Sequence, residues 1–306
     1  SYERIFIYIL DIKIKKMINK IYKNIHNKYS TLFIFIFFLR YLLGIFFISL
    51  VLLLLIPHFF DFKKKEEILK NHLSDRYGLK LNSYVSIKYN SLPIPNLEVK
   101  NADMSIDKDR LRMSTSSLNI YPKLTNIYNF KEFNSNKIII DKNRIILEDS
   151  DLKILINYIY NLKNRLILKD LDLKVNRKNK SLINFNNIYF SNYGYNKNIV
   201  TGKLYNKKFK IIISDNYDKI NFKLLNTGLT ADINIYEIKK NSLISGVFKS
   251  KFLNSNLKFN FNYGDKKLEI YNAYFRNKDL SFSNKSTIIY KPFFYLSSFS
   301  KLEDIN

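Results

Sequence analysis

The sequence predicts a mainly β protein with an amino-terminal transmembrane helix. Its body is an extended, twisted antiparallel sheet with an open, groove-like face and one or two short helices. Three observations lead to this prediction. Residues 31–60 are almost entirely apolar, and from residue 79 onward apolar and polar side chains alternate, which is typical of strands with one buried face. The chain also has no cysteine and only 7 glycines, so a disulfide framework or a glycine-rich phosphate loop is not expected.

The predicted anchor spans residues 32–60. Residues 41–60 carry no formal charge, and as a helix they would be about 30 Å long, the thickness of a bilayer's hydrocarbon core. Arg40 interrupts a longer apolar run and is expected at the headgroup level, where its guanidinium reaches water. A cleaved signal peptide is the alternative, but the apolar stretch exceeds the usual length of about 7–15 residues and no small-x-small cleavage site follows.

Residues 1–31 form a basic leader, which the positive-inside rule assigns to the cytoplasm. Its basic residues are Arg4, Lys13, Lys15, Lys16, Lys20, Lys23 and Lys28. Residues 1–16 precede Met17, so a second interpretation is that translation starts at Met17 and that residues 1–16 are not part of the native protein. Counted from Met17, the leader keeps only three lysines, and the positive-inside rule then hardly favours either orientation.

Two short helices are predicted beyond the anchor. In residues 61–77 one helical face carries Ile68, Leu69, His72 and Leu73. Gly78 follows where a left-handed helix end belongs. The second helix covers residues 150–161, with Ser150 as its expected cap. Its apolar face carries Leu152, Leu155, Ile156, Ile159 and Leu162.

Strands are predicted over most of the remaining chain. Turns with Asn, Asp, Gly or Lys separate the alternating runs at a spacing of roughly 8–14 residues, which indicates successive antiparallel hairpins. Pro93 and Pro95 fix two φ angles and remove two backbone donors, so their segment must lie at an edge or corner and reverse one strand onto the next. The alternating residues are Leu79, Leu81, Val85, Ile87, Tyr89, Leu97, Val99, Leu171, Leu173, Val175, Ile233, Ile235, Leu257, Phe259, Phe261, Tyr263, Leu268, Ile270, Leu280 and Phe282.

Catalysis and cofactor binding are not expected. The histidines His26, His58 and His72 flank the apolar segment instead of gathering with carboxylates elsewhere, so a Ser–His–Asp triad or a histidine metal site has almost nothing to be built from. Without cysteine, thiolate zinc sites and cysteine nucleophiles are excluded. We therefore expect no catalytic, cofactor-binding or metal-binding residues, and a protein that is not an enzyme.

The net charge of +25 would ordinarily suggest a nucleic acid or an anionic membrane surface as partner. Lysine, however, is enriched together with Asn, Ile, Tyr and Phe, as in chains from AT-rich genomes, and the lysines are spread along the sequence. We interpret the charge as dispersed and solvated. Because the aromatic residues alternate as core residues do and no nucleic-acid-binding motif accompanies them, no nucleic acid is expected as partner.

The order of the parts carries a family resemblance. An anchor and a short helix lead to residues 77–81, YGLKL, and then to residues 89–106, YNSLPIPNLEVKNADMSI. This arrangement resembles the amino-terminal region of the AsmA family of Gram-negative bacteria, including its TamB-like relatives. There, a strand leads through a proline-containing stretch into a second strand of the type apolar-Glu-apolar-x-Asn-Ala-x-apolar. Ser83 stands where the family usually has glycine, and the resemblance covers about residues 40–130.

The resemblance implies an inner-membrane protein with a cytoplasmic amino end and a periplasmic β-rich domain, residues 61–306. It implies a role in outer-membrane assembly and in phospholipid transport along an apolar groove. The expected partners are then the phospholipid bilayer and its acyl chains, with envelope proteins as further partners. On this reading the chain covers the membrane-proximal start of a longer groove and is truncated at its carboxyl end.

The candidate groove residues are Leu171, Leu173, Leu257, Phe259 and Phe261. Their alternation has two interpretations, a closed core or an open face left for lipid, and periodicity alone does not separate them. The alternative function is a membrane-tethered periplasmic scaffold, which recruits protein partners by strand addition at a sheet edge and carries no lipid.

Overall fold

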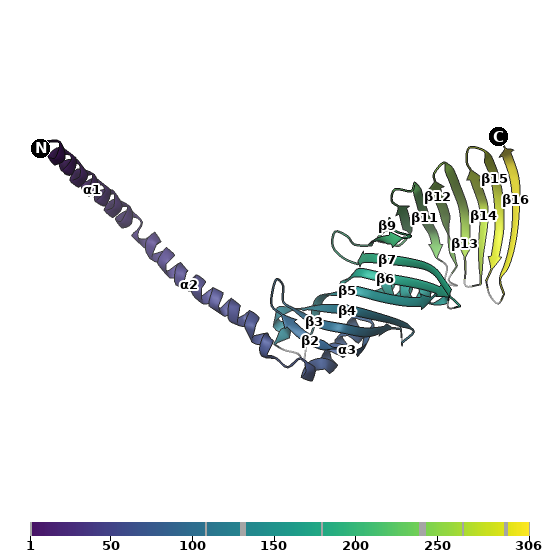
Figure 1. Ribbon diagram of the computed structural model, residues 1–306, viewed down its shortest axis with the longest axis horizontal. Coiled ribbons are helices and arrows are strands. Elements are labelled where there is room, and N and C mark those ends of the chain that lie inside the picture. Colours follow the sequence, from purple (N-terminus) through teal and green to yellow (C-terminus); the bar gives the residue numbers. More distant parts are fainter. Residues whose placement is uncertain are drawn as a thin grey trace. The chain divides into compact units, whose positions relative to one another are not determined.

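The computed structural model describes residues 2–107, 109–128, 133–178, 180–238, 243–264, 266–290 and 293–305. The chain divides into two compact units, Ser1–Phe60 and Asp61–Asn306. The first unit is helical, and the second contains the strands (Figure 1). The predicted fold class, mainly β with an amino-terminal apolar helix, is confirmed.

The first unit consists of α1 (Tyr2–Lys28), α2 (Ser30–Leu55) and the 3₁₀ turn η1 (Ile56–Phe59). The segment Ser30–Phe59 is long and apolar enough to cross a membrane. Its side chains are exposed; Phe38, for example, is 68% accessible and Ile48 64%. An apolar helix with such a surface requires an apolar environment, which fits a single-pass anchor.

The second unit opens with η2 (Lys63–Lys65) and α3 (Glu66–Tyr77). The predicted helix end is confirmed, because Gly78 has a left-handed φ of 62° and its N–H donates to the Ser74 carbonyl at 2.9 Å. Of the predicted face, Leu69, His72 and Leu73 are buried, whereas Ile68 is only half-buried.

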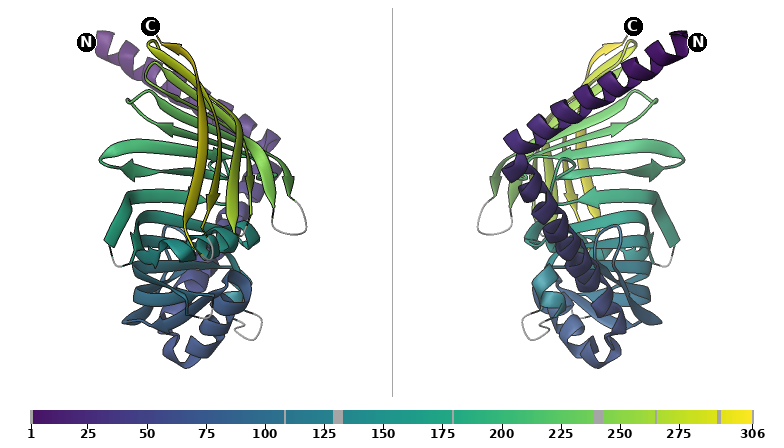
Figure 2. Two further views of the ribbon diagram at one scale, coloured as in Figure 1. Left: turned by 90° about the vertical axis from the view of Figure 1, so that its right-hand side faces the viewer. Right: turned by 90° about the vertical axis from the view of Figure 1, so that its left-hand side faces the viewer.

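One sheet holds the sixteen strands that are found in the described residues. The strands are β1 (Leu79–Ser83), β2 (Ser86–Asn90), β3 (Asn96–Ile106), β4 (Leu111–Pro122), β5 (Ser135–Glu148), β6 (Leu166–Arg177), β7 (Lys180–Ser191), β8 (Ile199–Leu204), β9 (Lys207–Ile213), β10 (Lys219–Leu224), β11 (Leu229–Ile238), β12 (Ile244–Phe252), β13 (Ser255–Tyr263), β14 (Lys267–Arg276), β15 (Leu280–Ile289) and β16 (Tyr295–Ile305). From β3 to β16 the order in the sheet is the order in the chain, while β1 and β2 both pair with β3. Figure 2 shows how the strand direction turns progressively along the sheet.

Neighbouring strands are antiparallel except for β5 and β6, which are parallel. The crossover between them contains η5 (Asp149–Asp151) and α4 (Leu152–Asn161), as a parallel connection requires. The predicted antiparallel sheet therefore has this one exception among its described strand pairs.

The predicted cap of α4 is wrong. Asp151, not Ser150, is the N-cap residue, and it makes no side-chain cap hydrogen bond. The Ser150 hydroxyl instead donates to the Asp151 carboxylate at 3.5 Å. The helix itself is present and packs near the end of α3, where a Cβ on Gly78 would lie 3.5 Å from the Tyr158 ring.

Pro93 and Pro95 lie where their chemistry predicts, in the turn that joins β2 to β3. The two strands pair antiparallel, with Tyr89 opposite Leu97. Tyr89 also stacks on Phe62 at a centroid distance of 6.3 Å, so the residues before α3 close over this end of the sheet. The proline turn thus reverses the chain without removing a hydrogen bond from a central strand.

Candidate functional site

The cross-strand register places all five candidate residues on one face of the sheet, which we call the apolar face. Leu171 and Leu173 lie in β6, and Leu257, Phe259 and Phe261 lie in β13. One row of paired residues leads from β6 to β16: Leu168, Phe190, Val200, Ile211, Phe222, Ala231, Ser250, Leu257, Phe275, Phe282 and Leu302. A second row is formed by Ile213, Ile220, Ile233, Phe248 and Phe259. Ser250 is the one polar residue in these two rows.

The apolar face is covered at one end of the sheet and open at the other. Leu171 and Leu173 are 4% and 9% accessible, so these two candidates belong to a packed core. Leu257, Phe259 and Phe261 are half-exposed. The two interpretations that the sequence left open therefore both apply, each to a different part of one face.

We call the half-exposed part of the apolar face, from β8 to β15, the open lane. Its residues are Val200, Ile211, Ile220, Phe222, Ile233, Phe248, Leu257, Phe259, Phe261, Ile270, Phe275 and Phe282. In contrast, the core in β3 to β5 contains side chains with 0% exposure: Leu97, Val99, Leu118, Ile120, Ile138 and Ile140. The open lane leaves apolar surface in contact with water, which is unfavourable unless another apolar group covers it.

Aromatic rings form much of the open lane. Phe248 stacks on Phe259 at a centroid distance of 4.7 Å, and Phe275 stacks on Phe282 at 5.0 Å. The Phe261 ring lies over Gly246 in the neighbouring strand, where an added Cβ would come within 2.8 Å of its Cζ atom. Cross-strand aromatic pairs stabilise a sheet while leaving one ring face available. The lane is therefore a surface of ring and aliphatic carbons that Ser250 interrupts in the first row.

The structure reveals an aligned row of extra residues that we did not predict from the sequence. Asn101, Lys142, Asp170 and Asn187 have φ angles of 46°, 51°, 48° and 51°, in strands β3, β5, β6 and β7. Each extra residue shifts the alternation of apolar and polar side chains by one position. Leu168 and Leu171, for example, are three residues apart and yet both lie on the apolar face. This change of phase is the signal that the sequence contains.

Side chains next to these extra residues satisfy the freed carbonyls. The Asn143 amide donates to the carbonyls of Ile140 and Lys169, both at 3.0 Å. The Thr115 hydroxyl donates to the Asp141 carbonyl at 2.6 Å. Asn143 and Thr115 are buried, and the donors of both side chains serve the bend of the sheet.

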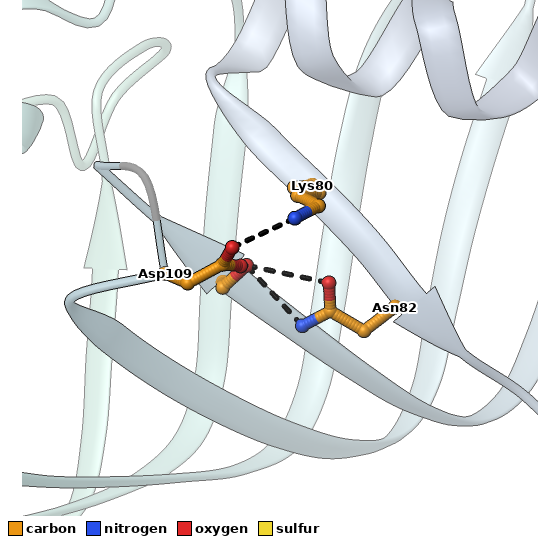
Figure 3. Close-up of polar contacts among 4 residues, drawn as sticks. Lys80, Asn82 and Asp109 are labelled. Carbon is orange, nitrogen blue, oxygen red and sulfur yellow. Dashed lines mark hydrogen bonds and ion pairs between the residues drawn. The ribbon is translucent and has the colours of Figure 1, made fainter.

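A polar network fixes the first strand of the sheet (Figure 3). Lys80 of β1 lies 2.7 Å from the carboxylate of Asp109, in the turn between β3 and β4. The Ser105 hydroxyl donates to the same carboxylate, and the Asn82 amide donates to Ser105 at 3.2 Å. The hydrogen bond from Lys80 lowers the pKa of Asp109. This network is structural, and no group of His, Asp and Glu suited to a metal is found in the described residues.

His72 is a buried residue of the core and not a ligand. Its Nε2 atom lies 2.8 Å from the Ser135 hydroxyl, and its ring meets Phe133 edge-on at 5.0 Å. Burial, with the nearby Arg76, lowers the pKa of His72 to about 4. The imidazole is therefore neutral in the folded chain at neutral pH.

Acidification is expected to destabilise the second unit through His72. The unfolded chain binds a proton near pH 6.5 and the folded chain only near pH 4, so the stabilisation is complete above pH 6.5 and is lost as the pH falls towards 4. Between pH 7 and pH 5 the free energy of unfolding should fall by about 2 kcal/mol. Urea unfolding of the full chain in detergent, followed by circular dichroism, measures this loss. His72→Gln should remove it; an unchanged pH dependence in that variant would contradict the assignment.

Comparison of the chain with known protein families, curated proteins and solved structures finds no match. The likeness to the AsmA family therefore rests on the order of parts and on residues 77–106. The candidate site itself rests on the geometry of the apolar face.

Proposed function

We propose that the protein is a membrane-anchored carrier of phospholipid acyl chains, which lie along the open lane while their headgroups stay in water. One observation carries this proposal: the same apolar face is closed by packing in β3 to β6, whereas from β8 to β15 most of it is half-exposed and only Phe209 and Ala273 are buried among its described apolar residues. If the apolar face served only as a core, polar residues would be expected on the part of the face that no other element covers. Here the apolar rows continue to Phe282 in β15.

The physical basis of this function is that an acyl chain buries a similar apolar area at every position along the lane, and that no reaction is catalysed. Each methylene group that leaves water contributes about 0.8 kcal/mol. Since the two rows contain no charged residue, an acyl chain that slides along them exchanges one apolar contact for another of similar free energy. Movement then meets little barrier, and no catalytic residue is needed.

We place this activity in the bacterial envelope. The apolar segment Ser30–Phe59 would hold the chain in the inner membrane, with the basic leader in the cytoplasm. The second unit would then lie in the periplasm and take part in outer-membrane assembly. The resemblance to the AsmA family and the seven basic residues before the anchor support this placement.

The test uses the absence of tryptophan from the chain. Phe259→Trp and Asn260→Trp each introduce a single reporter, on opposite faces of β13. In full chain reconstituted with phospholipids brominated on their acyl chains, the fluorescence of the Phe259→Trp variant should be strongly quenched and that of Asn260→Trp should not. Equal quenching of the two variants, or none in either, would contradict acyl-chain binding in the open lane.

A second candidate function is strand addition to a protein partner. Among the described strands β16 pairs only with β15, and all eleven of its residues are exposed. A strand that is paired on one side can accept a further strand on its other side. The tryptophan reporters separate the two functions, because a scaffold that carries no lipid leaves the Phe259→Trp variant unquenched.

A further inference from the structure

The face opposite the open lane, which we call the polar face, gathers basic residues that are scattered in the sequence. The register places Lys210 opposite Lys223 and Lys249 opposite Lys258. In the neighbouring row Lys251 pairs with Asn256, which pairs with Arg276. We call this set the basic cluster: Lys210, Lys223, Lys249, Lys251, Lys258 and Arg276. The interpretation of the charge as evenly dispersed therefore does not describe this surface.

In the described part of the chain, one neighbouring carboxylate, that of Asp232, offsets only part of the charge of the basic cluster. Asp232 lies opposite Lys249 in register, but its carboxylate accepts a hydrogen bond from Asn221. Among the residues described, no member of the cluster forms an ion pair. Other lysines do, at 2.7 Å for Lys197 with Asp215 and 2.6 Å for Lys267 with Glu269. Like charges directly opposite each other destabilise a sheet, so folding alone does not account for the arrangement.

Part of the cluster surrounds a shallow depression of about 220 Å³. Lys249, Lys251 and Lys258 line it together with the polar residues Thr230, Asn256 and Tyr274 and with one acidic residue, Asp232, so that three cationic groups face one carboxylate. Ammonium groups beside hydroxyl and amide donors provide the chemistry that recognises a phosphate. The depression is open to solvent and can receive a phosphate at the end of a larger molecule.

We propose that the basic cluster binds the phosphates of anionic phospholipid headgroups at a bilayer surface. The same chain carries an apolar segment suited to a membrane. A bilayer surface with anionic headgroups is therefore the multiply charged partner that we propose for the basic cluster. A nucleic acid fits less well, because sheets that bind single strands combine positive charge with stacking rings on one face. Here the rings of Phe248, Phe259 and Phe275 lie on the apolar face, opposite the lysines, and Tyr274 is the one aromatic residue that lines the depression. The proposal does not depend on acyl chains in the open lane.

The test measures the tethering of two vesicle populations. Full chain reconstituted in phosphatidylcholine vesicles should capture vesicles that contain phosphatidylglycerol and leave pure phosphatidylcholine vesicles free. Capture should weaken with rising salt. The triple variant Lys249→Gln, Lys251→Gln, Lys258→Gln should bind roughly 100-fold more weakly, at about fivefold for each lysine near an anionic surface.

The matched control removes the same charge from the polar face elsewhere, with Lys88→Gln, Lys169→Gln and Lys174→Gln, and should retain capture. Equal capture of neutral and anionic vesicles, or equal losses in the two triple variants, would overturn the proposal. So would binding of a single-stranded oligonucleotide that depends on Lys249, Lys251 and Lys258 while anionic vesicles stay free. Saturable binding of inorganic phosphate without vesicle capture would overturn it in favour of a free-phosphate site.

Discussion

Leu118→Ala is expected to lower the free energy of unfolding of the second unit by about 3 kcal/mol. Leu118 is 0% exposed and stands in β4 between Val99 and Ile140. Truncation removes buried methyl groups and leaves a cavity that rigid strands on both sides cannot fill. Urea unfolding of the full chain in detergent measures the change.

Leu257→Ala is the matched control, since it makes the same truncation on the same face of the sheet. Leu257 is half-exposed in the open lane, so its truncation leaves no enclosed cavity and should cost about 1 kcal/mol. The difference between the two variants reports whether the lane is open. Equal losses would mean that the lane is packed as tightly as the core, which would contradict the proposed function.

The sequence predicted those parts of the fold that depend on neighbouring residues. The apolar run before Phe60 has the length of a membrane span whatever surrounds it. Gly78 adopts the left-handed conformation that ends α3 because glycine has no Cβ to oppose it. Pro93 and Pro95 occupy a turn because proline cannot donate to a ladder. Each of these outcomes follows from local geometry.

Other features depend on contacts that are distant in the sequence. The alternation of Leu118 in β4 and of Leu257 in β13 is the same pattern, yet only Leu118 is fully buried. Elements such as α3, whose Leu69 and Leu73 are fully buried, cover the apolar face. The alternation of side chains within a strand does not show which part of the sheet is covered in this way. Two candidates were therefore core residues, and three lie in the open lane.

The parallel pairing of β5 with β6 was likewise not predicted from the sequence, although the helix between them was. Recognising that a helix inserted between two strands is a crossover would have indicated it. The basic cluster was missed for a related reason. Lys223, Lys249 and Lys258 are far apart along the chain, and only the register brings them together.

Phe259→Asp tests most directly whether the open lane conducts acyl chains. An ionised carboxylate in the middle of the lane must lose water each time a chain passes, which costs several kcal/mol. The rate at which an acyl-labelled phospholipid moves from vesicles carrying the full chain to acceptor vesicles should therefore fall at least about 100-fold. The control is Asn260→Asp, which adds the same carboxylate to the next residue of β13 on the opposite face.

Circular dichroism of both variants separates a blocked lane from a lost fold. The account predicts rapid transfer by the unaltered chain and by Asn260→Asp, and almost none by a folded Phe259→Asp. Equal transfer by the two folded variants, or no transfer by the unaltered chain, would contradict it.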